Sequence, residues 1–169
     1  MISVEQIKAL LHLKPLPVEG GYFAETYRAQ ESLAKEALPP RYGGARSVAT
    51  GIYYLLTPET FSAIHRLRSD EVYHFYLGDP VELLQLSPDG AGCVATLGAD
   101  LLQGMQLQAV VPQGVWQGSR LRSGGRFALL GTTMAPGFDP ADFEMGRRDE
   151  LIALYPRFKE TIAALTALA

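Results

Sequence analysis

The spacing of apolar positions divides the chain into three stretches. Near the start, apolar residues recur every three or four positions, and Ser3 followed by Gln6 is a capping-box pattern. This spacing predicts an amphipathic helix from Ser3 to about Leu13. Two prolines and two glycines in KPLPVEGG end it.

The middle of the chain alternates with a period of two. Residues 22–29 (YFAETYRA) have the alternation of a strand, which places Tyr22 and Arg28 on one face. Eight further short apolar or alternating runs follow between Arg46 and Met134, separated by turn signals rich in Gly, Pro and Asp. This pattern predicts an all-β sandwich or barrel. Residues 30–44, with prolines, glycines and little apolar pattern, are predicted to form a long loop.

After Met134 the spacing becomes helical again. DELIALYPRFKETIAALTALA is predicted to form two helical pieces broken at Pro156, packed on the outside of the barrel. We expect a single domain over residues 1–169, with a barrel core at about 22–134 and a helical tail at about 139–168.

Composition narrows the function classes. The chain has 169 residues, 20% of them charged, and a net charge of −3. These values are typical of a folded globule and argue against a nucleic-acid polymer as partner. No apolar run reaches the roughly 20 residues that span a bilayer, and the start lacks the pattern of a secretion signal, so we expect no membrane partner and a cytoplasmic location. The single cysteine, Cys93, is expected to be a buried, inert thiol.

The stretch HRLRSDEVYHFYLGDP holds the clearest candidates for chemistry. Strand alternation places His65 on the apolar face with Ala63 and Leu67, and Glu71 on the next strand with Phe75 and Leu77. Both side chains are therefore expected to face the interior. Burying them is costly unless they bind each other or a ligand.

The candidates fall into three groups. His65 is a candidate base, Glu71 would orient or polarise it, and Tyr73 is a candidate acid. Residues expected to bind a ligand are Tyr22, Arg28, Tyr53, Arg66, Gln117 and Arg120. The alternative interpretation of the arginines is that they lie on solvent-exposed strand faces. His74 is not a candidate, because it lies three positions after Glu71 and strand alternation places it on the opposite side of the strand.

The spacing of these residues resembles the motifs of the cupin superfamily. The first motif is Gly, five residues, His-x-His, three or four residues, Glu, six residues, Gly, and His65, Glu71 and Gly78 reproduce part of that frame. The second motif, Pro-x-Gly, two residues, His, matches residues 112–117 with Gln117 at its end. EGGYFAETYR, HRLRSDEVYHFYLGDP, VPQGVWQGSR and PGFDPADFEMGRRDELIALYP are similar to stretches of the DUF985, or cupin_5, group. The resemblance implies a jelly-roll barrel, commonly a homodimer, in a group whose role is largely unassigned.

The resemblance also bears on metal binding. Cupin metal centres usually take three histidines and a glutamate, and here His65 and Glu71 match ligands, Leu67 replaces one and Gln117 another. A divalent metal held by His65, Glu71 and Gln117 is an alternative, and no cofactor is favoured.

Three functions stay open at this point. The first is a metal-independent isomerase or epimerase acting on a carbohydrate-like or nucleotide-linked molecule, by analogy with other jelly-roll barrels. The second is a module that binds an anionic or nucleotide-like small molecule without turnover. The third is a metal-dependent cupin oxygenase or isomerase.

Overall fold

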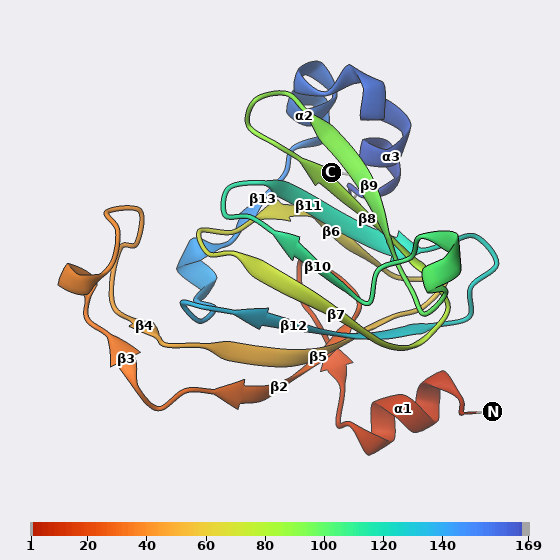
Figure 1. The fold of residues 1–169 in the computed structure, drawn as a ribbon, viewed down its shortest axis with the longest axis horizontal. Helices are drawn as coiled ribbons and strands as arrows, with labels where there is room; N and C mark the ends of the chain where they lie inside the picture. The colour runs from red at the N-terminus through yellow and green to blue at the C-terminus, as the bar shows by residue number, and fades with distance from the viewer. Residues whose placement is uncertain (1, 167–169) are drawn as a thin grey trace.

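Two antiparallel β-sheets face each other in the computed structural model, which describes residues 2–166 (Figure 1). The six-stranded sheet has the order β1 (Lys14–Pro15), β2 (Tyr22–Arg28), β5 (Thr50–Leu56), β12 (Ala128–Met134), β7 (Glu71–Gly78), β10 (Gln108–Val111). The five-stranded sheet has the order β13 (Glu144–Met145), β6 (Phe61–Arg66), β11 (Trp116–Leu121), β8 (Val81–Leu86), β9 (Gly92–Leu97). The prediction of an all-β fold is confirmed.

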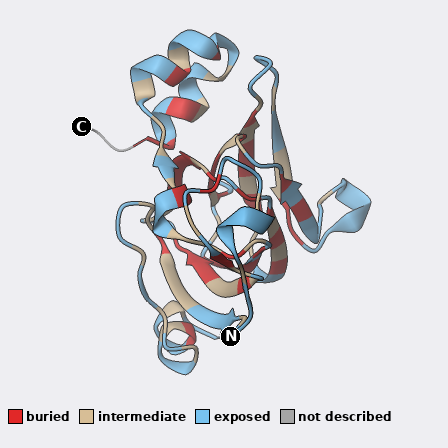
Figure 2. Ribbon diagram, turned by 90° about the vertical axis from the view of Figure 1, so that its left-hand side faces the viewer, coloured by how far each residue is buried: buried red, intermediate tan, exposed pale blue. Residues whose placement is uncertain are grey.

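The main core lies between the two sheets. Period-two alternation sends one side of each long strand inward, and these residues are among the buried residues drawn in red in Figure 2. Examples are Tyr54 and Leu56 from β5, Phe75 from β7 and Leu83 from β8. One part of this interior is not filled with apolar side chains, and it holds the candidate site described below.

Helices pack against part of the outer face of each sheet, as predicted from the apolar spacing. Helix α1 (Val4–Leu10) begins with the expected capping box of Ser3 and Gln6, and its Ile7 packs near Leu55 of β5. Helices α2 (Arg148–Leu154) and α3 (Lys159–Ala164), separated by η4 (Pro156–Phe158), pack over Ile64 and Leu84 of the five-stranded sheet. The predicted tail reached residue 168, and residues 167 and 168 lie outside the described part of the chain.

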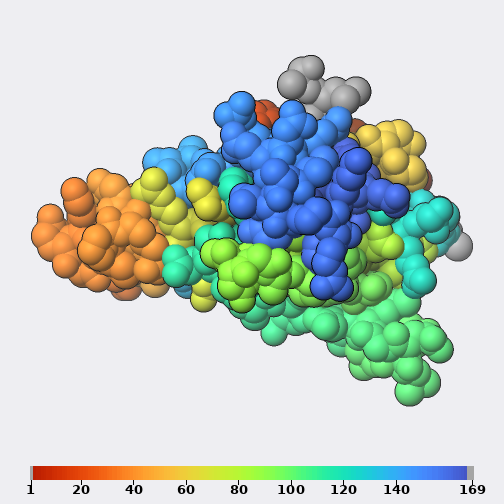
Figure 3. Space-filling model, turned by 90° about the horizontal axis from the view of Figure 1, so that it is seen from above, coloured from red at the N-terminus to blue at the C-terminus, as the bar shows by residue number. Residues whose placement is uncertain are grey.

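The predicted loop after β2 has some short structure of its own. It contains β3 (Ser32–Leu33), paired with β4 (Arg46–Ser47), and the 3₁₀ turn η1 (Lys35–Ala37). This hairpin projects from the barrel, drawn in orange in Figures 1 and 3. Two other 3₁₀ turns are η2 (Leu101–Gln103) and η3 (Pro140–Asp142).

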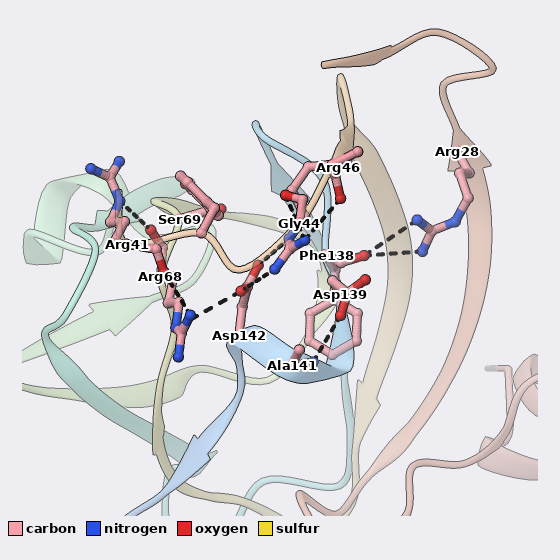
Figure 4. Close-up of polar contacts among 12 residues, drawn as sticks. Arg28, Arg41, Gly44, Arg46, Arg68, Ser69, Phe138, Asp139, Ala141 and Asp142 are labelled. Atoms are coloured by element: carbon pink, nitrogen blue, oxygen red, sulfur yellow. Dashed lines mark hydrogen bonds and ion pairs between the residues drawn. The ribbon is translucent and has the colours of Figure 1, made fainter. Parts of the chain in front are cut away.

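A buried ion pair fixes η3 to the base of the hairpin. Arg46 donates from Nε and Nη2 to the two carboxylate oxygens of Asp142, both at 2.6 Å, and the Asp142 side chain is fully buried (Figure 4). Arg46 also donates from Nη1 to the Gly44 and Ala45 carbonyl oxygens. The segment from Phe138 to Phe143 is thereby held against the barrel.

Two expectations about side-chain direction were wrong. The register of β2 shifts between Glu25 and Tyr27, so Arg28 lies on the inner side with Glu25 while Tyr22 packs on the outer side near α1. Cys93 is exposed, because β9 is the edge strand of its sheet and this residue points to solvent.

Within residues 2–166, no helix combines the length and the apolar character that crossing a bilayer requires.

Candidate functional site

A cavity of about 210 Å³ lies between the two sheets, and the segment around Phe138 forms part of its wall. Its walls are partly apolar and partly polar, and they come from the turn before β2 and from β2, β5, β6, β7, β12 and η3. The lining residues are Leu16, Glu19, Phe23, Glu25, Arg28, Thr50, Ile52, Tyr54, His65, Leu67, Glu71, Tyr73, Thr132, Met134, Phe138 and Pro140.

His65 reaches the cavity from β6, on the face that strand alternation predicted. The residue is 1% exposed, and its ring stacks on Phe143 with centroids 4.9 Å apart. Its Nδ1 lies 2.8 Å from the Ala63 carbonyl oxygen. A carbonyl oxygen only accepts hydrogen bonds, so Nδ1 carries the hydrogen and Nε2 is the basic position of the neutral ring. The backbone thus selects the tautomer that a general base needs.

Glu71 lies at the first position of β7 and is 7% exposed. Gln117 of β11 donates from Nε2 to its Oε2 at 2.8 Å. Burial raises the pKa of the Glu71 carboxyl above its ordinary value; His65 opposes this increase, Glu19 adds to it, and hydrogen bonds from Thr132 and Gln117 oppose it. The carboxyl is therefore a group whose proton affinity the fold has increased.

Two tyrosines line the same cavity. Tyr73 follows Glu71 by two residues on β7, and Tyr54 donates its hydroxyl hydrogen to the Gly20 carbonyl oxygen at 3.0 Å. Burial raises the pKa of both hydroxyls well above the ordinary value, and for Tyr73 the Glu71 carboxyl adds to the increase. Both hydroxyls thus keep their hydrogens and can donate them in hydrogen bonds.

Glu19 also lines the cavity, and the sequence analysis did not find it. It follows Val18, which has a left-handed φ of 71°, and its N–H donates to the Pro17 carbonyl oxygen at 2.8 Å. This is a γ-turn of the rare, strained kind. The Ser62 hydroxyl donates to Glu19 Oε1 at 2.8 Å. The sequence feature that marks this turn is EGG: a Cβ at Gly20 would clash with the Phe61 carbonyl oxygen, so only glycine fits there.

Arg28 lies at the rim of the cavity and is already paired. Its guanidinium donates from Nε and Nη2 to Glu25 at 2.9 and 2.7 Å. It also donates from Nη1 and Nη2 to the Phe138 carbonyl oxygen at 3.3 Å (Figure 4). The pair leaves this arginine with little free charge to offer a ligand.

The other residues predicted to bind a ligand do not line the cavity. Tyr22 and Tyr53 belong to the cluster around α1, on the outer face of the six-stranded sheet. Arg66 pairs with Glu144, and Arg120 pairs with Glu82. Gln117 reaches the site only through Glu71.

His74 lies on the outer face, as its parity predicted. Its Nε2 is 3.1 Å from the Thr133 hydroxyl, and Gln108 lies 3.1 Å from its Nδ1. His65 of β6 therefore faces the cavity between the sheets, whereas His74 of β7 lies on the outer face of the six-stranded sheet.

The residues present fit a metal ion poorly. Among residues 2–166, no group of three or more His, Cys, Asp or Glu side chains is arranged to hold one. Leu67 occupies the position where the family motif has a second histidine. The amide of Gln117 directs its nitrogen at Glu71, and its Oε1 is buried without a hydrogen-bond partner. One imidazole, one carboxyl with a raised pKa and one amide are a weak donor set.

A family model and a yeast protein match most of the chain. A family model described as "Cupin superfamily (DUF985)" matches residues 5–146. The uncharacterised protein YML079W of Saccharomyces cerevisiae is 32% identical over 134 residues, covering 73% of this chain and 66% of that protein, so the match spans just under two thirds of the yeast chain.

Two solved structures show how far the fold extends. A hypothetical protein from Leishmania major has a TM-score of 0.87 and 31% identity, covering 99% of this chain and 100% of the other. Oxalate decarboxylase from Bacillus subtilis has a TM-score of 0.52 and 13% identity, covering 90% of this chain and 37% of the other, and at that identity it shows the fold alone.

Proposed function

The chain belongs to the cupin superfamily (DUF985), and on that premise we propose that its barrel cavity is a metal-independent site for proton transfer on a small carbonyl compound. The reaction class is isomerase or epimerase, and the substrate is carbohydrate-like, either free or as the sugar part of a nucleotide-linked molecule. The observation that carries the proposal is the His65 ring, whose Nδ1–H is held by a backbone carbonyl.

The proposed roles follow from what each group can do. Nε2 of His65 takes the proton from the carbon next to the carbonyl. Tyr73 keeps its hydrogen because burial raises its pKa, so it donates to the carbonyl oxygen as negative charge develops there. Glu71, 7% exposed and in the same cavity, stabilises the imidazolium that forms. In an epimerisation the proton returns to the same carbon from the opposite face. In an isomerisation it goes to the former carbonyl carbon, while the hydroxyl proton of the neighbouring carbon moves to the former carbonyl oxygen.

Cavity size is consistent with such a substrate. About 210 Å³ is below the roughly 300 Å³ at which drug-sized sites begin, so the cavity fits a molecule of one ring or a short chain. A nucleotide-linked substrate would place only its sugar inside.

The test is carbon–hydrogen exchange in heavy water. Small aldoses, ketoses and hydroxycarbonyl compounds are incubated with the protein, and proton NMR follows loss of the signal next to the carbonyl. We expect exchange with the unmodified protein and its loss in His65→Asn. His74→Asn is the matched control, because His74 lies on the outer face, and it should keep the activity. Equal exchange in His65→Asn, or none with the unmodified protein, would overturn the proposal.

A second candidate is a binding module without turnover, which the apolar part of the lining favours. Leu16, Phe23, Ile52, Met134 and Phe138 are the kind of wall that holds a small ligand. In that case ligands would shift the melting temperature while no carbon-bound proton exchanges.

The metal-dependent alternative is suggested by a protein of similar fold that binds a metal. The Bacillus subtilis oxalate decarboxylase has Mn(II) centres. In this chain the metal would have to be held by His65, Glu71 and Gln117, the weak set described above. A stoichiometric metal in the purified protein would favour this alternative over the first.

A further inference from the structure

The charged side chains that line the cavity do not neutralise one another completely. Glu25 and Arg28 neutralise each other at the rim through two hydrogen bonds. Glu19 and Glu71 have no such partner: within residues 2–166, neither forms an ion pair with an arginine or lysine. His65 is the one remaining lining residue of the described chain that can carry positive charge.

The two carboxyl groups are close enough to affect each other. Glu19 raises the pKa of Glu71, as a negative charge does across a shared, poorly solvated space. Ser62 holds Glu19 in place by donating to its Oε1, and the strained turn at Val18 fixes the backbone that carries it. An anionic ligand would add a further negative charge to the same cavity, next to these groups.

Carboxylate oxygens also determine the hydrogen-bonding chemistry of a ligand. They only accept hydrogen bonds, so a ligand beside Glu19 has to donate them. Hydroxyl groups do this without bringing charge, and the C–H faces of a hydroxylated ring suit the apolar walls near Phe23 and Phe138.

We infer that the cavity takes a polyhydroxylated compound of about monosaccharide size that carries no negative charge, that Glu19 accepts hydrogen bonds from its hydroxyl groups, and that Glu19 excludes anionic analogues. This inference rests on the proposed assignment of the barrel cavity as the ligand site. It predicts that neutral sugars bind in preference to sugar acids and sugar phosphates. The proposed reaction class alone makes no such distinction.

The experiment compares matched pairs of probes by saturation-transfer NMR. Glucose, galactose, mannose and xylose are the neutral members, and glucuronate and galacturonate are the anionic ones. We expect at least one neutral sugar to bind at least tenfold more tightly than its uronate. In Glu19→Gln, the preference should fall by fivefold or more, because the amide removes the charge and can still accept from Ser62.

Two controls keep the result interpretable. Glu82→Gln makes the same change of charge on a residue paired with Arg120 away from the cavity, and it should leave the preference intact. Glu19→Asp keeps the charge, so it should keep the preference, and it serves if the amide variant fails to fold.

Several outcomes would overturn the inference: no neutral sugar binding, uronates binding as tightly as neutral sugars, or an unchanged preference in Glu19→Gln. These outcomes are distinct from failure of the proposed reaction. A neutral preference without carbon–hydrogen exchange would keep the inference and reject the isomerase, and exchange on a sugar acid would do the reverse.

Discussion

Glu71 combines burial with a charge that the surroundings compensate only in part. Its raised pKa means that the folded chain binds this proton more tightly than the unfolded chain does. Folding is therefore favoured at low pH by this group, and that contribution is lost as pH rises from the ordinary value of 4.5 through the folded pKa. The sign is opposite to that of a salt-bridged carboxylate.

The first prediction concerns Glu71→Gln, which is nearly isosteric and can still accept from Gln117. We expect its free energy of unfolding to equal that of the unmodified protein near pH 4 and to exceed it at pH 8, because the variant has no buried carboxylate to ionise. Urea unfolding across that pH range measures the difference, with Glu82→Gln as control. A loss of roughly 3–5 kcal/mol at pH 8 would instead identify His65 and Glu71 as a structural ion pair.

The second prediction concerns Gln117, whose amide replaces a histidine of the family motif. Protein purified without added metal should contain much less than one ion per chain, by elemental analysis. Gln117→His should bind nickel or zinc more tightly than the unmodified protein in a calorimetric titration, because imidazole is the better ligand for both. Stoichiometric metal in the unmodified protein, or no gain in the variant, would contradict this prediction.

At the scale of elements, regular strands were predictable and irregular connections were not. His65 and Glu71 were placed correctly because alternation holds from Ile64 to the end of β6 and over the first part of β7, whereas the register of β6 shifts between Ser62 and His65. The helix at the start was readable from Ser3 and Gln6. The bulge in β2 reversed the side of Arg28, because one extra residue breaks a period of two.

The missed parts of the site depend on contacts that no local pattern records. Glu19 enters the cavity through a turn whose geometry is fixed by packing against Phe61. The pair of Arg46 and Asp142 joins residues 96 positions apart in the chain. Neither feature has a period, so spacing arguments could not reveal it.

The third prediction tests how η3 is fixed. Arg46→Met leaves the Asp142 carboxylate buried without its main partner, and we expect a loss of roughly 3–5 kcal/mol in the free energy of unfolding. The double variant Arg46→Met, Asp142→Leu should recover most of that loss. Arg66→Met, which breaks an exposed pair with Glu144, should cost less than about 1 kcal/mol. Equal losses for Arg46→Met and Arg66→Met would contradict the distinction.

At the scale of the whole molecule, the six-stranded sheet leaves one edge partly open. Strand β1 pairs with Tyr22 and Phe23, and within the described residues no strand pairs on that side of residues 24–28. An open strand edge is a surface on which a second chain can add.

The cytoplasmic location inferred from the sequence stays a prediction.

The fourth prediction is that the protein is a homodimer with the N-terminal segment at the contact. Light scattering at micromolar concentration should give twice the chain mass of 18.4 kDa. Tyr27, which is 56% exposed on β2, lies at this edge, and Tyr27→Lys should weaken the dimer. A monomeric mass for the unmodified protein would reject the prediction.

The exposed position of Cys93 has a practical consequence. The chain has one cysteine, and it lies on the edge strand β9, outside the lining of the cavity. A maleimide dye or a nitroxide would therefore attach at one site without any engineered substitution and without touching His65 or Glu71. Two such labels in a dimer would report the distance between the two β9 strands. The native thiol therefore allows the arrangement of the subunits to be measured.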